Sequence, residues 1–212
     1  MLTVHHLRKS QSERIVWLCE ELDVAYDLRL YARDPVTSLA PAEYKALHPM
    51  GTAPVITDDG GVTLAETGAI IEYILARHGG GALAISPGAQ DYPAYVYWLH
   101  FAQGTMVPTE MLAMVTSIMG GDAGRIAPLM ARRMLAFAMI ERRLGEEPYF
   151  AGQALTAADI AMVFGLTTMR YFVPFDLSSY PAIRAYLARI GERPAYRRAM
   201  AKGDPDVPPL LD

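Results

Sequence analysis

Up to about residue 80, short apolar runs alternate with stretches in which apolar residues recur every three or four positions. The first pattern is typical of strands, and the second of helices with one buried face. The predicted strands are residues 2–4, 25–31, 55–57 and 62–64. The predicted helices are residues 12–22, 41–47 and 67–78. Because a helical crossover joins parallel strands and a hairpin joins antiparallel ones, this order predicts a mixed four-strand α/β sheet.

From about residue 91 onward, every apolar pattern has a helical period. The predicted helices are residues 91–118, 125–145, 156–171, 180–191 and 194–202, with a break at Gly120-Gly121 between the first two. Gly79-Gly80-Gly81 and Ser86-Pro87-Gly88 interrupt both patterns, as turn-forming residues do. We therefore predict an α/β domain over residues 1–80, a linker over 81–90 and an all-helical domain over 91–212.

One helix of the second part has a marked start signal. Thr156 is followed three residues later by Asp159, the spacing of a capping box, and Leu155 and Ile160 flank this pair as a hydrophobic staple. The residues that follow are apolar nearly all round, so we expect this helix to be buried. The role of Asp159 is then in folding, where such a cap contributes roughly 1 kcal/mol.

The segment Pro49 to Ile56 predicts a binding edge for an extended ligand. Pro54 stands where a strand begins, and a cis Ala53–Pro54 bond would hold the turn there. The backbone groups of Ala53 and Val55 would then find no partner in a neighbouring strand. An extended peptide-like ligand can pair with such groups.

A second ligand motif follows at Glu66-Thr67-Gly68, where a strand passes into a helix. Thr67 is a candidate N-cap, the unpaired N–H groups of the helix start can bind a carboxylate, and Glu66 can bind an ammonium group. Glutathione is a small ligand with an extended peptide backbone, an α-carboxylate and an α-ammonium group. Together the two motifs predict glutathione binding.

These motifs resemble the cytosolic glutathione transferase family, and the resemblance covers nearly the whole chain. It implies a thioredoxin-like N-terminal domain, an all-helical C-terminal domain and a homodimer. Serine-type members carry the catalytic serine four residues before an arginine at a helix start, which matches Ser10 and Arg14, although Ser12 could compete. His5-His6 stands where other classes carry a tyrosine, and Lys9 where bacterial beta-type members carry a cysteine.

The glycine end of glutathione and the second substrate need further residues. Gly51 and Thr52 depart from family members with a histidine and a lysine at these places, so His48 or Arg8 is expected to hold the glycine carboxylate. We expect the pocket for the second substrate between the domains, although core packing would explain each of its candidate residues as well. These candidates are Tyr97, Phe101, Met106, Met111 and Met114.

The composition and net charge argue against several other classes of protein and site. The net charge of −4 argues against a nucleic-acid partner, and no apolar run approaches the roughly 20 residues of a membrane span. Cys19 is the single cysteine and lies on an apolar helix face, so redox exchange between two protein thiols is excluded and a core role is favoured. The five histidines have no metal-type spacing, and we expect no metal.

The sequence thus predicts a cytoplasmic detoxification enzyme that activates the glutathione thiol for attack on a small hydrophobic electrophile. A glutathione-dependent peroxidase, isomerase or dehalogenase of the same fold is a second reading. A non-catalytic interaction module is a third, because this fold is also used for docking.

Overall fold

The computed structural model describes residues 1–120 and 122–212, and the chain forms two compact units. The first contains residues 1–83 and 192–209, and the second contains residues 84–191 and 210–212. The division differs from the expected one, because the last helix belongs with the N-terminal unit. Of the predicted break at Gly120-Gly121, Gly121 lies outside the described residues.

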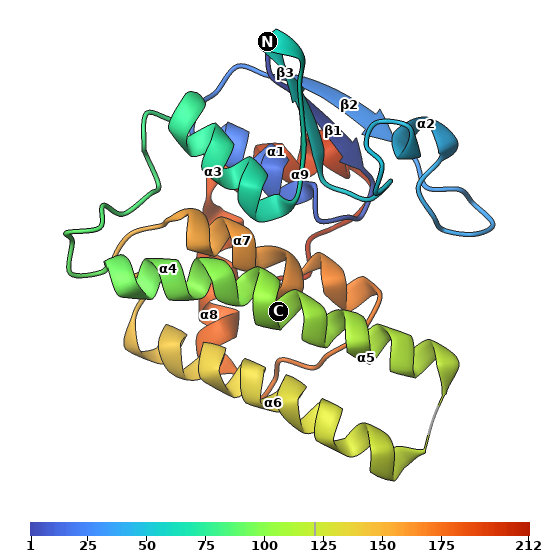
Figure 1. Ribbon diagram of the computed structural model, residues 1–212. Coiled ribbons are helices and arrows are strands. Elements are labelled where there is room, and N and C mark those ends of the chain that lie inside the picture. Colours follow the sequence, from blue (N-terminus) through green and yellow to red (C-terminus); the bar gives the residue numbers. More distant parts are fainter. Residues whose placement is uncertain (121) are drawn as a thin grey trace. The chain divides into compact units, whose positions relative to one another are not determined.

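The first unit is built on a four-strand sheet of order β2-β1-β3-β4 (Figure 1). Its elements are β1 (Thr3–Leu7), α1 (Glu13–Glu21), β2 (Asp27–Tyr31), α2 (Ala42–Lys45), β3 (Val55–Asp58), η1 (Asp59–Gly61), β4 (Val62–Ala65), α3 (Thr67–Arg77) and α9 (Pro194–Gly203). β1 pairs in parallel with β2, while β1–β3 and β3–β4 are antiparallel. The predicted mixed sheet and thioredoxin-like order are confirmed.

The β3–β4 hairpin turns where the sequence predicted. Asp58 is paired with Val62 across η1, a single 3₁₀ turn. Gly60 and Gly61 have φ angles of 77° and 79°, a backbone region that glycine enters without a steric penalty. The glycine pair therefore sets the tight turn.

Successive residues of β1 face opposite sides of the sheet, as the period of a strand requires. Leu7 packs with Val55 and with Tyr44 of α2 on one face. His5 lies on this face too, with its ring bonded to Tyr31 and to Thr57. His6 points to the other face, toward the start of α1 and the end of α9.

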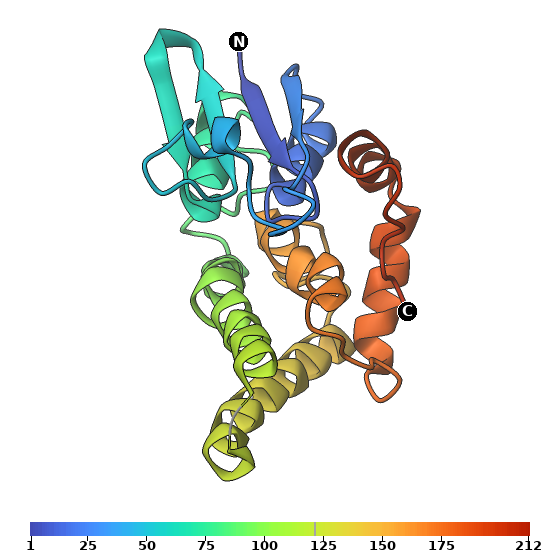
Figure 2. The same ribbon diagram turned by 90° about the vertical axis from the view of Figure 1, so that its right-hand side faces the viewer.

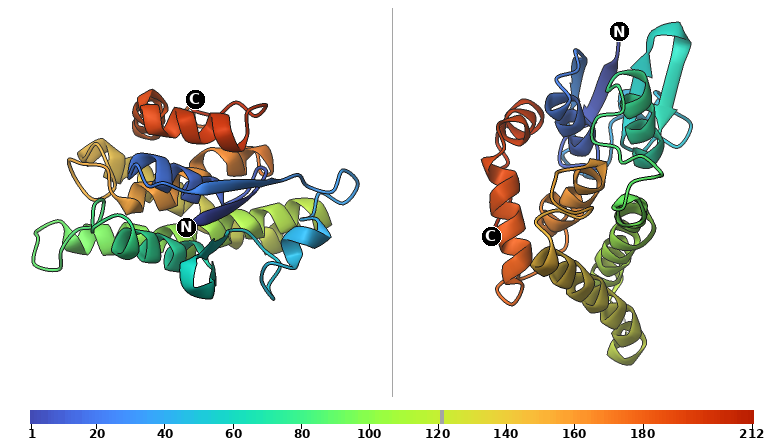
Figure 3. Two further views of the ribbon diagram at one scale, coloured as in Figure 1. Left: turned by 90° about the horizontal axis from the view of Figure 1, so that it is seen from above. Right: turned by 90° about the vertical axis from the view of Figure 1, so that its left-hand side faces the viewer.

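α9 packs along α1, although nearly the whole chain separates them in sequence (Figure 3). The Trp17 and Tyr196 rings meet edge to face with centroids 5.1 Å apart. Arg198 donates to the Glu20 carboxylate at 2.8 Å, and Arg193 pairs with Glu21. These contacts fix the C-terminal end of α9 beside β1, which proves important for the site.

The second unit is helical, as predicted, and contains no strand among its described residues. Its elements are α4 (Tyr92–Phe101), η2 (Ala102–Met106), α5 (Val107–Met119), α6 (Ala123–Glu146), α7 (Ala157–Leu166), η3 (Thr168–Tyr171) and α8 (Pro181–Glu192). α4, η2 and α5 form one rod, which matches the helix predicted over 91–118 (Figure 1). A π-helical segment interrupts it just before Pro108, which has no N–H for an ordinary helical bond.

α7 is the buried helix of this unit and lies beside α4 (Figure 2). Its capping box is confirmed: the Thr156 hydroxyl accepts from the Ala158 N–H, and Asp159 accepts from the Thr156 N–H at 2.8 Å. The predicted helix 156–171 is too long, because Thr167 leaves helical geometry after Leu166. None of the described helices is long and apolar enough to cross a membrane.

Candidate functional site

Ser10 lies in the loop between β1 and α1 and is almost completely buried in the first unit. Ser10 is 5% exposed, and its Oγ accepts a hydrogen bond from the Ser12 N–H at 3.2 Å. The two serine Oγ atoms are 2.7 Å apart, so one hydroxyl donates to the other. These two contacts hold the Ser10 hydroxyl in a fixed position next to the start of α1.

Ser12 occupies the N-cap position of α1, but its side chain does not cap the helix. Its Oγ instead accepts from the Leu7 N–H at 3.1 Å and lies 2.9 Å from Nδ1 of His6. Ser12 is fully buried. Of the two candidate serines, only Ser10 keeps an exposed fraction, so the structure favours Ser10 as the group that meets a ligand.

A histidine and a carboxylate complete this arrangement. Nε2 of His6 lies 2.9 Å from Oδ2 of Asp204, the residue that ends α9. His6 is 0% and Asp204 2% exposed. The result is a continuous buried hydrogen-bond series, here called the Ser–His–Asp network. Its members in order are Ser10, Ser12, His6 and Asp204.

The loop is tied to this network by its own backbone. Asp204 accepts from the Lys9 N–H at 3.1 Å, and Lys9 has a φ angle of 48° that turns the chain toward Ser10. Arg33 donates to the carbonyl oxygens of Arg8 and Lys9 at 2.8 and 3.0 Å. The position of Ser10 is therefore fixed from three segments that are distant in sequence.

Arg14 lies behind the site. It is fully buried and donates from Nη2 to Oγ1 of Thr67 at 3.1 Å and from Nε to the Gln11 carbonyl at 3.2 Å. Burial lowers the pKa of Arg14 to about 9, which still leaves the guanidinium charged at neutral pH. Arg14, which the resemblance places among the glutathione contacts, forms a bridge between the loop and the start of α3, and a direct ligand contact stays a prediction.

The start of α3 presents unpaired donors. Glu66 occupies the N-cap position predicted for Thr67, and the Thr67 side chain accepts from Arg14 instead. Glu66 is exposed with a φ angle of 73°, a conformation that costs free energy for a residue with a side chain. The first N–H groups of a helix have no acceptor within it. At Gly68 a Cβ atom would meet nothing within 4 Å, so a ligand can approach this backbone.

The first predicted motif, Pro49 to Ile56, leads into β3, the strand that pairs with β1. The Ala53–Pro54 bond is cis, as predicted. Val55 is the first residue of β3 and pairs with His5 and Ala65, so the prediction of a free Val55 backbone is wrong. Ala53 precedes the strand, and within residues 1–120 and 122–212 its backbone has no hydrogen-bond partner.

The candidate groups for the glycine end of glutathione have other contacts. Nδ1 of His48 accepts from the Met50 N–H at 3.3 Å, and Gly51 closes the same turn with a φ angle of 62°. Arg8 pairs with Asp204 and Asp206. His48 is half-buried and lies in the loop that leads to Ala53. The guanidinium group of Arg8 already forms ion pairs with two carboxylates of the same chain.

Comparison with known proteins identifies the family. Residues 10–77 match the model of the glutathione S-transferase N-terminal domain, and residues 107–194 match that of the C-terminal domain. A glutathione S-transferase structure from Actinobacillus pleuropneumoniae is 36% identical, with a TM-score of 0.88 over 96% of this chain and 93% of that one. The chain belongs to the glutathione S-transferase family. The predicted family, fold and enzyme class are confirmed.

Curated relatives are similar to this chain over most of their length. Glutathione S-transferase 3 of Schizosaccharomyces pombe is 29% identical, with 95% of this chain and 88% of that protein covered. The disulfide-bond oxidoreductase YfcG of Escherichia coli is 26% identical, with 95% of both chains covered. The similar proteins therefore include an oxidoreductase as well as transferases.

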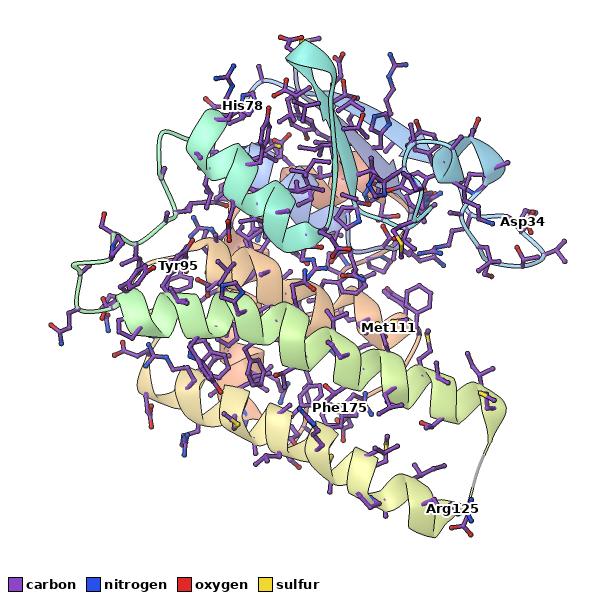
Figure 4. All side chains as sticks on the ribbon, viewed as in Figure 1. Asp34, His78, Tyr95, Met111, Arg125 and Phe175 are labelled. Carbon is purple, nitrogen blue, oxygen red and sulfur yellow. The ribbon has the colours of Figure 1, made fainter. Side chains whose placement is uncertain are left out.

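The residues expected to line the second substrate pocket of this transferase are divided by the structure. Phe101 packs on Trp98 with ring centroids 4.9 Å apart, and Met106 lies where a Cβ on Gly165 would meet it at 2.8 Å, so both side chains pack in the helical core. Met114 packs against a second apolar cluster. Tyr97 on α4 is exposed. Met111 on α5, labelled in Figure 4, is exposed too.

His6 and Asp204 were missed by the sequence reasoning as parts of the site of this transferase. The adjacent pair His5-His6 was considered for metal binding and as the place where other classes carry a tyrosine, and Asp204 lies just beyond the last predicted helix, which ends at residue 202. The two are separated by 198 positions, and no local motif connects them. Among the described residues, no three His, Cys, Asp or Glu side chains gather as metal ligands would.

Proposed function

We propose that this transferase binds glutathione on the first unit, with the sulfur at Ser10 and the γ-glutamyl end at the start of α3. The hydroxyl of Ser10 donates a hydrogen bond to the thiolate. The observation that carries the proposal is the position of Ser10, which keeps an exposed fraction while its Oγ is held by the Ser12 N–H at 3.2 Å. A hydroxyl fixed beside a helix N-terminus stabilises an anion there.

The start of α3 supports the binding of the γ-glutamyl group. The N–H groups of Thr67 and Gly68 are expected to donate to its α-carboxylate, and the exposed Glu66 carboxylate to bind its α-ammonium group. The free backbone of Ala53 is expected to pair with the cysteinyl residue of the ligand. In this orientation the ammonium group of the ligand meets the Glu66 carboxylate, and the ligand carboxylate meets the positive end of the α3 dipole.

The reaction then follows from the thiolate, which is the nucleophilic form of the thiol. The sulfur electron pair forms a carbon–sulfur bond with the electrophile, and the leaving group departs with the electron pair of the broken bond. The thiol proton has left the sulfur before this step. The substrate class is a small hydrophobic electrophile, for which the exposed Tyr97 and Met111 are the remaining predicted contacts.

The test is a comparison of Ser10→Ala with Ser178→Ala, which removes an exposed serine of the helical unit. Ser10→Ala should lower turnover with a standard electrophile roughly 10²-fold, as the loss of an oxyanion donor does, and leave glutathione affinity nearly unchanged. Ser178→Ala should match the wild type in both measurements. Full turnover in Ser10→Ala would refute the assignment of Ser10.

A disulfide reaction would have to proceed without the protein thiol. Cys19 is buried, and this burial raises the pKa of its thiol to about 12, so the reactive thiolate is absent at neutral pH. Any oxidoreductase activity like that named for the Escherichia coli relative would therefore use glutathione sulfur alone. Alkylation of Cys19 in the unfolded but not the native protein would confirm its inertness.

We further propose a homodimer that forms through the helical unit. α5 and α6 expose several large apolar side chains, more than a monomer surface requires. They are Leu112, Val115, Ile118, Met119, Leu129, Met134 and Leu135. Sedimentation equilibrium should give twice the chain mass, and Ile118→Glu should shift the equilibrium toward the monomer. A cytoplasmic location and a role in detoxification stay predictions.

A further inference from the structure

The Ser–His–Asp network can be fully hydrogen-bonded in two ways that differ in the direction of every hydroxyl. Each serine oxygen has one proton to donate and two lone pairs to accept with. Each also has one fixed backbone donor, the Leu7 N–H at Ser12 and the Ser12 N–H at Ser10. The remaining lone pair and proton of Ser12 face Ser10 and His6, with the Leu7 carbonyl oxygen at 3.4 Å as a longer-range acceptor. Those of Ser10 face Ser12 and the ligand side.

In the first arrangement, the imidazole of His6 is neutral and donates from Nε2 to Asp204, whose carboxylate lies 2.9 Å away. Nδ1 then accepts the Ser12 hydroxyl at 2.9 Å, and Ser12 accepts the Ser10 hydroxyl at 2.7 Å. All protons point inward, so the Ser10 oxygen presents a lone pair to the ligand side. It can accept a thiol proton.

In the second arrangement, His6 carries a proton on both nitrogens and forms an ion pair with Asp204. Nδ1 donates to Ser12, Ser12 donates to Ser10, and the Ser10 hydroxyl points outward. It can now donate to an anion on the ligand side. No heavy atom has to move between the two arrangements, because every distance serves both directions.

We propose that the series Ser10–Ser12–His6 carries the thiol proton of bound glutathione into the protein. The thiol proton moves to Ser10, the Ser10 proton moves to Ser12, and the Ser12 proton moves to Nδ1 of His6. One proton leaves sulfur and one arrives at imidazole, so the charges become thiolate and imidazolium. The inference rests on the proposed function, since it places the glutathione sulfur at Ser10.

The charged group that faces Nε2 of His6 is the carboxylate of Asp204. Burial alone would raise the pKa of this carboxyl, but hydrogen bonds from His6, the Lys9 amide and Arg8 hold the pKa below its usual value. An ionised carboxylate next to the ring stabilises imidazolium. The guanidinium groups of Arg8 and Arg33 on the neighbouring loops also interact with the Asp204 carboxylate and so compete with imidazolium for its negative charge. Arg8 is in turn paired with Asp206.

The proposed proton transfer gives the C-terminal end of α9 a role in the site. Asp204 ends α9, and Gly203 before it leaves room for the imidazole, since a Cβ there would lie 3.0 Å from Nε2 of His6. His6 touches no ligand in this scheme. It is a positioning residue that acts through the two serines as the final acceptor of the proton.

Nitrogen NMR of the histidine rings in the full-length protein tests the relay directly, with the His6 signals assigned by their loss in His6→Asn. In the free wild type at slightly alkaline pH, His6 should be neutral with its proton on Nε2. Saturating glutathione should give the thiolate absorbance and convert His6 to imidazolium together. S-methylglutathione, which binds but has no thiol proton, should leave His6 neutral.

The outcomes separate the relay from the proposed function. Thiolate formation that depends on Ser10 but leaves His6 neutral, or His6 already charged without glutathione, would overturn the relay and leave the proposed function standing. Binding without thiolate in the wild type would overturn the proposed function itself. In both results the state of His6 or of the thiol is observed in the wild-type protein, so loss of folding in a variant cannot produce that signal.

A second variant checks the role of the carboxylate. Asp204→Asn keeps the acceptor for the His6 N–H and for the Lys9 N–H while it removes the charge. We expect the pH midpoint of thiolate formation to shift upward and the bound-state imidazolium to disappear. A merely structural role of Asp204 would lower stability without moving this pH midpoint, and that result would contradict the relay.

Discussion

Nη2 of Arg14 donates a hydrogen bond to Oγ1 of Thr67 at 3.1 Å and thereby joins the start of α1 to the start of α3. Both residues are buried, and they are 53 positions apart in the sequence. Ser10 lies just before the first helix and Glu66 just before the second. The contact therefore sets the separation between the two ends of the proposed glutathione site.

Removal of this bridge should affect binding and stability together. Arg14→Lys keeps the charge but loses the planar group that reaches Gln11 and Thr67 at once. We expect the free energy of unfolding to fall by about 1–3 kcal/mol, because buried polar partners lose their bond. Glutathione affinity should fall about tenfold. Denaturant unfolding and calorimetric titration measure the two effects.

Thr67→Val is the matched control for the bridge, since it removes only the acceptor and keeps the shape. If the contact is what matters, the Arg14→Lys and Thr67→Val effects should be strongly non-additive in the double variant. Additive effects would show that each residue acts through other contacts.

The charge of Glu66 should be needed for glutathione affinity and not for folding. Glu66→Gln removes the proposed partner of the α-ammonium group at an exposed position and should weaken glutathione binding about tenfold at low ionic strength. Glu72→Gln removes an exposed carboxylate from the same helix and should bind as the wild type does. Equal affinities of the two variants would exclude the contact.

The glycine beside His6 should be irreplaceable. A Cβ at position 203 would lie 3.0 Å from Nε2 and 3.3 Å from Cδ2 of His6, so Gly203→Ala should displace the ring and lower turnover roughly 10²-fold. Gly145→Ala in α6 meets its nearest neighbour only at 3.9 Å and should keep full activity, with stability raised by about 0.5–1 kcal/mol. Retained turnover in Gly203→Ala would argue against a role for the ring position.

Asp159 should make stability depend on pH in an unusual direction. Burial raises the pKa of this carboxyl from 3.8 to about 6, so the folded state binds more protons than the unfolded state between these values. The free energy of unfolding should therefore fall as pH rises through this interval. Asp159→Asn cannot titrate, so its stability relative to the wild type should increase over the same interval. Urea unfolding at several pH values measures the difference.

Local patterns were sufficient for most of the fold. The Asp58–Gly61 turn, the Thr156–Asp159 box and the order of strands and helices all depend on residues close together in the sequence, and the structure contains each of them. The two ligand motifs could be found for the same reason. The end of α7 was misplaced, because Thr167 and Thr168 follow Leu166 without a glycine or proline that would stop the helix.

Errors arose where a side chain had several possible partners. Ser12 and Thr67 both stand at helix starts, where their hydroxyls usually cap, yet each is used by a residue from another element. The preference for capping amounts to about 1 kcal/mol, which a buried hydrogen bond to His6 or Arg14 can match. Val55 was misjudged because the pairing of β3 on both sides depends on the whole sheet.

By itself, the sequence determined the elements, the turn chemistry and the serine loop, because propensity, capping and apolar periodicity act over a few residues. Only the tertiary structure decided that α9 returns to α1 and brings Asp204 to within 2.9 Å of His6. Packing of Trp17 against Tyr196 fixes that return, and it involves residues 179 positions apart. No local rule encodes such a distant contact, since its free energy comes from apolar surface buried jointly by both helices.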